Sequence, residues 1–361
     1  VQVAVSLGHA LRKEHKLKVR QPLPAAHLVA SSERVLSFLK DQQHLIAEEL
    51  NVDLKQVKVA NAPPKAVFVN SLLGAQITGG SCSVRDAWTK LRIAGAQVRE
   101  MLITAAAGRW GVDRDLIKAD KGMIYGPKGL KATYGELAEA ATRMPVPEQP
   151  PLKDPKNFKV VGTRTKRTDT PIKVNGTAQF GIDVTLPGMV YASLAQCPVI
   201  GGKVKSFDGA KAKASAGVID VVQISDGVAV VASSWWQAKK ARDLLSIQWD
   251  EGAGASLSDA SVIDGTRQAL KTGKVLEITK PQGDVAAALK GAAKVVEAEY
   301  VIPMQAHAPL EPMNFTAHVQ GNKALLIGPT QFQQGAQGAV AGALGLKPED
   351  VTLQTTFLGG G

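Results

Sequence analysis

A short glycine turn, residues 78–83, combines a flexible backbone with three hydroxyl groups directly before a run of helical character. The first turn of a helix carries N–H groups without intrahelical partners, and the helix dipole favours an anion at that end. Glycine lets the backbone approach a ligand closely, because it has no side chain. The candidate anion-binding residues are Thr78, Gly79, Gly80, Ser81 and Ser83. An ordinary glycine turn with a serine cap has the same pattern, so both interpretations stay open at the level of the residues.

A second polar cluster lies in residues 305–314, within apolar surroundings. His307 and Glu311 are four residues apart, which on a helix could place both side chains beside one metal ion. Pro309 and Pro312 prevent a regular helix there, because proline lacks the N–H and clashes with the preceding turn. The pattern therefore argues against a helical metal pair and leaves a rigid polar loop as an equal alternative.

Gln331 follows the apolar run 324–327, which is typical of a buried strand. Polar residues just beyond such strands often line clefts, and an amide offers both a donor and an acceptor without charge. The chain closes on Gly359, Gly360 and Gly361, whose backbone N–H groups are unscreened by side chains. A surface turn and a flexible turn are the alternative interpretations of these two segments.

Several classes of site are disfavoured by composition. The two cysteines, Cys82 and Cys197, are far apart in sequence and form no CxxC pair, so a zinc or iron–sulfur site within this chain is not expected. The net charge of +11 suits nucleic acid, an acidic partner or an anionic cofactor. No long Lys/Arg run with interleaved aromatics occurs, which argues against nucleic acid for the chain as a whole. No span of about 20 apolar residues predicts a membrane helix.

The tryptophans Trp235, Trp236 and Trp249 are interpreted as packing residues rather than as a stacking platform. The neighbouring Lys239-Lys240 pair is interpreted as part of a solvated helix face.

These candidate residues need elements that position them, and 45% hydrophobic residues suffice for buried cores. Apolar residues at three- and four-residue spacing predict a helix from Ser83, as its N-cap, to about Gly111. A helix is also predicted at 33–50 and a strand at 57–60.

A proline-rich linker, residues 144–155, separates this part from a run of short apolar segments. Strands are predicted at 189–192, 218–224 and 228–232, and a helix at 235–245. They predict a compact α/β domain that ends near Asp250, followed by a strand-and-helix unit from about Lys294.

From about Ala47 onward the chain resembles the molybdopterin-binding large subunit of the xanthine oxidase family. The resemblance is densest with the isoquinoline 1-oxidoreductase beta-subunit type and with related aldehyde dehydrogenases. The blocks that carry it are residues 47–54, 73–81, 173–178, 186–189, 310–314, 328–331 and 357–361.

The resemblance implies a role for each candidate segment. The Thr78–Ser81 turn would hold the pterin and phosphate, and Gln331 would hydrogen-bond an oxygen ligand of molybdenum. Gly359, Gly360 and Gly361 would begin a loop whose backbone meets that oxygen. Glu311 and Asn314 would shape the substrate pocket. No protein side chain would ligate the metal, because the dithiolene of the cofactor does so.

The family chemistry is hydroxylation of an electron-poor carbon in an N-heterocycle or an aldehyde, with oxygen from water and hydride transfer to the molybdenum cofactor. The resemblance implies a molybdopterin cofactor, in its cytosine dinucleotide form. It also implies 2Fe–2S clusters on a separate small iron–sulfur subunit, since two cysteines cannot build them here.

Two departures from the family pattern stand out. The general-base glutamate of the family belongs beyond Gly361, and a Gly-Gln-Gly cofactor segment is missing before Ala47. Residues 1–52 instead resemble the C-terminal region of a bacterial isoleucyl-tRNA synthetase. We therefore expect a truncated, chimeric chain that is inactive alone. The alternative function is a tRNA-binding remnant, with weak tRNA binding through residues 1–46.

The predicted fold is α+β and multidomain. Mixed sheets and helices would form incomplete molybdenum-cofactor-binding domains and a small α/β domain of hammerhead type. The predicted division is a synthetase-like fragment (1–46), part of a molybdopterin-binding domain (47–143), a linker (144–159), the small domain (160–250) and the start of another molybdopterin-binding domain (251–361). The sequence does not decide between the bacterial cytoplasm and the periplasm as the location of the protein. It also does not identify the substrate or the electron acceptor.

Overall fold

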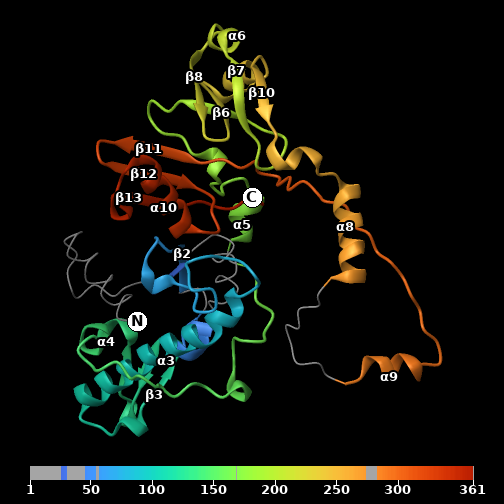
Figure 1. Cartoon of the computed structure of the whole chain (residues 1–361). Helices are drawn as coiled ribbons and strands as arrows, with labels where there is room; N and C mark the ends of the chain where they lie inside the picture. Colours follow the sequence, from blue (N-terminus) through green and yellow to red (C-terminus); the bar gives the residue numbers. More distant parts are fainter. Residues whose placement is uncertain (1–25, 31–44, 54–56, 168, 274–282, 361) are drawn as a thin grey trace. The chain divides into compact units, whose positions relative to one another are not determined.

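A computed structural model describes residues 26–30, 45–53, 57–167, 169–273 and 283–360 (Figure 1). The chain divides into two compact units, one of Val1–Val184 with Ala308–Gly361 and the other of Thr185–His307. Both contain helices and sheets, which agrees with the predicted mixture of helix and strand. The domain boundaries drawn from the sequence divide the chain differently and stay predictions.

Helix α3 (Ser83–Trp110) is the longest element of the first unit. Its buried side packs against residues 45–50, which are also helical. Gly95 permits this close approach, because a Cβ there would lie 3.0 Å from Cβ of Glu49. The helix ends at Gly111, whose φ of 62° is left-handed. The N-cap position is occupied by Cys82, so the predicted cap at Ser83 was wrong by one residue.

A small antiparallel sheet adjoins α3 and completes this core. Its strands are β3 (Lys118–Asp120), β4 (Met123–Tyr125) and β5 (Lys131–Thr133), in the order β3-β4-β5. Helix α4 (Tyr134–Ala141) follows at once, begun by a capping box between Thr133 and Glu136. Figure 1 shows α3 and α4 side by side. The fully buried side chains of the core include Ile124 and Leu137.

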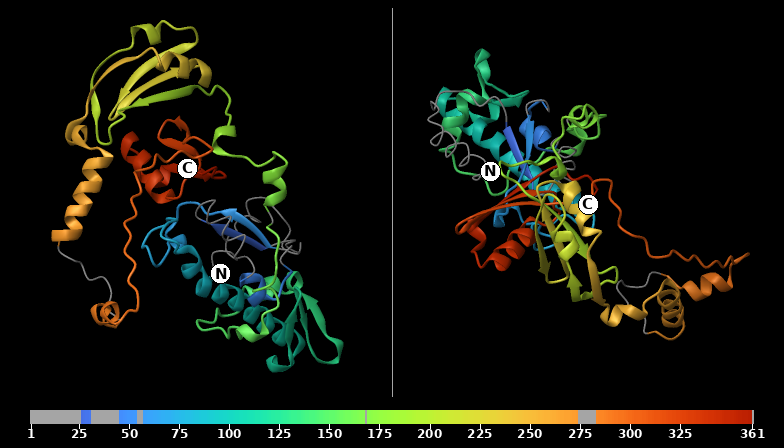
Figure 2. Two further views of the ribbon diagram at one scale, coloured as in Figure 1. Left: turned by 90° about the vertical axis from the view of Figure 1, so that its right-hand side faces the viewer. Right: turned by 90° about the horizontal axis from the view of Figure 1, so that it is seen from above.

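A second sheet of the first unit carries the predicted Gln331 segment. Strand β12 (Lys323–Gly328) pairs antiparallel with β11 (Thr316–Gln320) and parallel with β13 (Val351–Thr355). Helix α10 (Gln333–Leu344) connects β12 to β13, as the red segments in Figures 1 and 2 show. It packs on the sheet through Ala341. The crossover places the carboxyl ends of β12 and β13 and the N-terminus of α10 at one sheet edge.

Strands β1 (Ala26–Ala30) and β2 (Val57–Asn61) form a parallel pair in the first unit, with Ala26 opposite Val57. The remainder of the predicted synthetase-like segment, residues 1–25 and 31–44, lies outside the described residues. The same holds for most of the helix predicted at 33–50.

The second unit is built on an antiparallel sheet of β6 (Tyr191–Gln196), β9 (Gly227–Ala232) and β8 (Val218–Ile224), in the order β6-β9-β8. Strands β7 (Lys203–Asp208) and β10 (Ser246–Asp250) form an antiparallel ribbon. Helices α6 (Ala210–Lys213) and α7 (Trp235–Arg242) share a small core with this sheet. The strands predicted at 218–224 and 228–232 and the helix predicted from Trp235 are confirmed.

Two further helices, α8 (Asp259–Thr272) and α9 (Val285–Lys290), follow in the second unit. Residues 294–309 form neither helix nor strand, and the strand expected near Lys294 begins only at Thr316.

Candidate functional site

Gln331 and the Thr78 turn, predicted parts of one site, lie in contact. The Gln331 side-chain Nε2 donates to the backbone oxygen of Thr78 at 3.0 Å, across 253 residues of sequence. In return, the backbone N–H of Thr78 donates to the backbone oxygen of Gln331 at 2.8 Å. An isolated antiparallel bridge between Ile77 and Phe332 extends this pairing. The loop after β12 is therefore tied directly to the turn before α3.

The turn itself presents backbone N–H groups to open space. Gly80 and Ser81 have φ values of 58° and 53°, so two successive residues are left-handed. A Cβ placed on Gly79 would meet no atom within 4 Å. Among the described residues, none accepts a hydrogen bond from the backbone N–H of Gly79, Gly80, Ser81 or Ser83. This arrangement suits an anion, since the α3 dipole points its positive end here.

Asp86, the acidic residue in the first turn of α3, already has partners. Its carboxylate accepts from the backbone N–H of Ser71 at 2.9 Å and pairs with Lys90 at 2.6 Å. Its charge is thus partly neutralised by partners on this chain. Buried Cys82 lies in the turn and its Sγ donates to the oxygen of Gly80 at 3.3 Å.

Gln76, which the sequence analysis missed, fixes the start of this turn. Its side chain is fully buried; Oε1 accepts from the N–H of Lys65 at 2.9 Å and Nε2 donates to the oxygen of Pro63 at 3.0 Å. Its own N–H donates to Oε1 of Gln334 at 2.9 Å, on α10. Only the fold reveals this role, because the contacts span separate parts of the sequence.

Glu311, predicted to shape a substrate pocket, joins three loops. Its Oε2 accepts from the N–H of Gly359 at 2.7 Å, and its own N–H donates to the oxygen of Gly359 at 3.1 Å. Its Oε1 accepts from the N–H of Ile182 at 3.1 Å and from Nδ2 of Asn314 at 3.0 Å. The carboxylate is thus occupied by donors of this chain, and the geometry supports a positioning role.

Two glycines allow these loops to converge. A Cβ on Gly359 would lie 2.4 Å from Cβ of Glu311. A Cβ on Gly181, a position absent from our predictions, would lie 2.4 Å from Oδ1 of Asn314 and 2.5 Å from Cδ of Pro329. Pro329 lies two residues before Gln331. The close packing of Gly181 against Asn314 and Pro329 therefore links the 311–314 loop to the loop that carries Gln331.

Residues 357–360, near the end of the sequence, also contact the Gly181 segment. Phe180 and Phe357 form a parallel bridge with ring centroids 5.8 Å apart. Gly360 has a φ of 117°, a conformation that favours glycine, and Gly361 lies outside the described residues. A series of pairwise contacts therefore links the predicted site segments that the structure describes, all within the first unit.

Near this region, four buried atoms of three polar side chains have no hydrogen-bond partner among the described residues. Gln333, the first residue of α10, is fully buried and neither amide atom has a partner. The same holds for Oδ1 of Asn61 and Oγ1 of Thr355, residues joined by a 2.6 Å bond from Asn61 Nδ2 to the Thr355 oxygen. Buried polar groups without partners cost free energy. These atoms at the ends of β2, β13 and α10 would be satisfied by an additional polar molecule.

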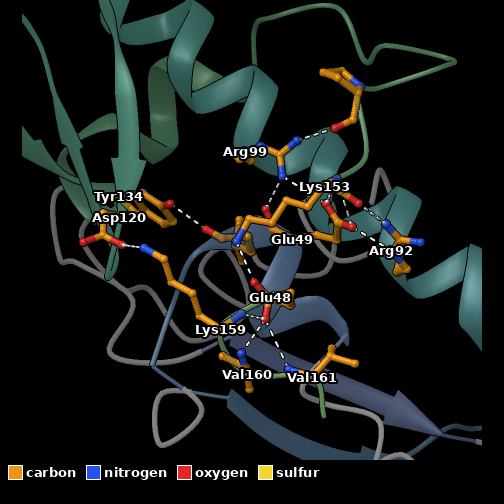
Figure 3. A network of polar contacts seen from close by, with 12 residues as sticks. Glu48, Glu49, Arg92, Arg99, Asp120, Tyr134, Lys153, Lys159, Val160 and Val161 are labelled. Carbon is orange, nitrogen blue, oxygen red and sulfur yellow. Dashed lines mark hydrogen bonds and ion pairs between the residues drawn. The ribbon is translucent and has the colours of Figure 1, made fainter. Parts of the chain in front are cut away.

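A separate buried network, drawn in Figure 3, anchors the linker to the core. The Glu48 carboxylate accepts from Lys153 Nζ at 2.8 Å and from the backbone N–H groups of Lys159, Val160 and Val161. Burial alone raises the pKa of Glu48, but these hydrogen bonds, led by the one from Lys153, hold it below its usual value.

The adjacent Glu49 pairs with Arg92 at 2.8 Å and with Arg99 at 3.1 Å, both on α3. Every carboxylate oxygen of Glu48 and Glu49 thus has a partner within the chain, so we interpret the network as structural.

Several known proteins resemble this chain. Residues 268–361 match the model of a molybdopterin cofactor-binding domain. Isoquinoline 1-oxidoreductase subunit beta of Brevundimonas diminuta is 29% identical over 88% of this chain and 46% of its own length. Membrane-bound aldehyde dehydrogenase (pyrroloquinoline-quinone) of Gluconacetobacter polyoxogenes is 29% identical over 88% of this chain and 42% of its own. The resemblance to molybdopterin-binding subunits is confirmed, and the chain spans about half the length of these relatives.

A different relative matches a short stretch. Isoleucine–tRNA ligase of Protochlamydia amoebophila is 75% identical over 52 residues, which cover 14% of this chain and 5% of the ligase. This match supports the chimera inferred from the sequence and provides no support for tRNA binding. Within the described residues, no helix is both long enough and apolar enough to cross a membrane.

Proposed function

We propose that this chain is part of the large subunit of a molybdenum hydroxylase, an oxidoreductase that uses a molybdopterin cofactor. The cofactor would lie where the Thr78 turn, the Gln331 loop and the Gly359–Gly360 segment converge. The observation that carries the proposal is the two-way hydrogen bonding between Thr78 and Gln331. It joins a turn with free N–H groups to the part of the chain that matches a molybdopterin cofactor-binding domain.

The residues present fit such a group. Backbone N–H groups of Gly79, Gly80, Ser81 and Ser83 suit its phosphate, at the positive end of α3. Gln331 uses one N–H for Thr78 and retains a second N–H and its Oε1 for a ligand. The unpartnered buried atoms at the adjoining sheet edge support a bound polar molecule in this region.

The chain's own residues would position the cofactor and substrate. Glu311 fixes the 311–314 loop against Gly359 and Ile182. Asn314, at the other end of this loop, donates a hydrogen bond to the Glu311 carboxylate. When bound, the cofactor supplies a molybdenum centre that oxidises an electron-poor carbon with oxygen from water. The substrate class would be an N-heterocycle or an aldehyde, the classes that the relatives' names indicate.

Further parts of the proposal concern the assembly. We infer the cytosine dinucleotide form of the cofactor and a separate iron–sulfur subunit. One relative is itself named a subunit beta, which supports a multi-subunit assembly. We also expect the 361-residue chain alone to oxidise no substrate, because we identify no general-base glutamate of the family among its residues.

The test is to produce the chain in bacteria that make molybdopterin and to measure what it retains. We expect molybdenum by mass spectrometry, fluorescence of the oxidised pterin, and CMP released by acid hydrolysis. Gln331→Ala removes the side-chain bond to Thr78 and should lower pterin content several-fold. Gln354→Ala, at an exposed amide on β13, is the matched control and should leave it unchanged.

Absence of pterin from the folded wild-type chain would overturn the cofactor assignment. So would retention of a quinone instead, which the second relative's name suggests for that protein. Molybdenum-dependent oxidation of a heterocycle or aldehyde by the purified chain would contradict only the expected inactivity.

The second candidate is a tRNA-binding remnant in residues 1–46, which rests only on the likeness of sequence to the ligase over 52 residues. It predicts a salt-sensitive shift of tRNA in gels that disappears when residues 1–46 are deleted. An equal shift by the deleted chain would exclude this candidate.

A further inference from the structure

The outer face of α7 carries two tryptophans that the sequence analysis interpreted as packing residues. Trp235 is 52% exposed and Trp236 is 56% exposed, so neither is a core residue. The opposite face of the helix, through Ala238 and Ala241, is the buried one. The helix therefore packs with small residues and presents its two largest apolar side chains outward.

Two basic side chains lie beside the indole of Trp236. Lys239 Nζ and Lys240 Nζ lie 5.7 Å and 5.0 Å from the centroid of the Trp236 ring. Helix α6 shares the core of α7 and adds exposed Lys211 and Lys213. We call this surface the Trp–Lys face; it consists of Lys211, Lys213, Trp235, Trp236, Lys239, Lys240 and Arg242. Five of the twelve residues of the two helices are basic and none is acidic.

Nearby carboxylates neutralise only part of this charge. Asp220 pairs with Lys213 at 3.0 Å, and Asp243 pairs with both Lys239 and Arg242, at 3.2 Å and 3.0 Å. Among the described residues no ion pair engages Lys211 or Lys240. The face thus keeps a positive charge beside its apolar surface, which complements an anionic partner.

We propose that the Trp–Lys face docks on an anionic lipid surface. Tryptophan prefers the boundary between headgroups and acyl chains, and lysines beside it attract anionic headgroups. Single-stranded nucleic acid fits less well. The two rings are tilted by 34° with centroids 6.4 Å apart, and the Lys239 and Lys240 ammonium groups lie against Trp236, so the two rings do not form a parallel stacking platform. A protein partner is also less favoured, because lysine is depleted at the centre of protein interfaces.

The test is sedimentation of the full chain with vesicles of phosphatidylcholine alone and of phosphatidylcholine mixed equally with phosphatidylglycerol. We expect binding to the mixed vesicles that salt weakens. A chain of net charge +11 binds anionic vesicles to some extent regardless of any face. The deciding variant is therefore Trp235→Ala with Trp236→Ala, which keeps the charge and should weaken partition about tenfold or more. Leu270→Ala, at a side chain that is 84% exposed, is its matched control and should change nothing.

A second pair of variants tests the charge. Lys239→Glu with Lys240→Glu should reduce the preference for phosphatidylglycerol much more than Lys290→Glu with Lys294→Glu, at exposed positions elsewhere in the same unit. Circular dichroism checks that each variant is folded. The proposal is overturned if the double tryptophan variant binds as well as the wild type, or if both lysine pairs have equal effects. It is also overturned if these substitutions abolish binding to oligo-dT while vesicle binding is unchanged.

Discussion

Gly359 and Gly79 of the candidate site differ in what surrounds them. Substitutions at the two positions can therefore distinguish an effect on packing from an effect on ligand binding. A methyl group on Gly359 would collide with Cβ of Glu311 at 2.4 Å, whereas one on Gly79 would enter open space. Gly359→Ala should therefore lower the free energy of unfolding of the first unit by about 1–3 kcal/mol. Gly79→Ala should leave it unchanged within about 0.5 kcal/mol.

Gly79→Ala also separates cofactor content from stability. If the cofactor lies against the Thr78 turn, Gly79→Ala reduces retained pterin although the protein is as stable as the wild type. Urea unfolding and pterin fluorescence measure the two effects separately. Equal stability losses in both variants would show that the space beside Gly79 is filled by protein.

At the scale of elements, the Glu48 carboxylate holds the linker through the N–H groups of residues 159–161 and through Lys153. Its pKa is lowered in the folded chain, so its contribution is complete above the unfolded pKa, near 4.5, and is lost as pH falls through the folded value. We expect amides 159–161 to lose hydrogen-exchange protection in acid.

Glu48→Gln should remove that pH dependence and destabilise the linker contact by about 1–3 kcal/mol at neutral pH, because the buried donors lose a charged acceptor. Glu139→Gln is a suitable control, since its pair with Arg143 lies on the surface. Unchanged acid sensitivity in Glu48→Gln would assign the transition to another group.

Elements with a clear apolar period were predictable from the sequence: α3, α7, β8, β9 and β12. The period of α7 did not reveal which face is buried, because alanines rather than the large apolar residues pack against its sheet. The start of α3 was misplaced because left-handed residues at 80 and 81 bring Cys82 into the cap position.

The candidate site was predictable as separate segments and not as an arrangement. The Thr78–Gln331 bonds span 253 residues, and no local pattern encodes such a contact. Resemblance supplied the expectation that these segments meet. Gly181, Gln76 and Gln333 were missed because a close backbone approach, or a buried amide, leaves no mark in the sequence around it.

At the scale of the whole molecule, the second unit is one continuous stretch of sequence between the two segments that form the first. Val184 and Ala308 flank it, and each unit has its own buried cluster. Such an insertion is expected to fold and unfold as a unit of its own, because cooperativity follows the shared core. The two units should therefore respond separately to substitutions in their cores.

Leu137→Ala, at a fully buried side chain of the first unit, should destabilise that unit by about 2–5 kcal/mol. Val230→Ala, fully buried in the second, should destabilise the second by about 1.5–3 kcal/mol. Hydrogen exchange in increasing denaturant, read by mass spectrometry on peptides of each unit, measures both at once. If each substitution lowered protection in both units equally, the chain would be a single cooperative body, and the Trp–Lys face would then be coupled energetically to the candidate cofactor site.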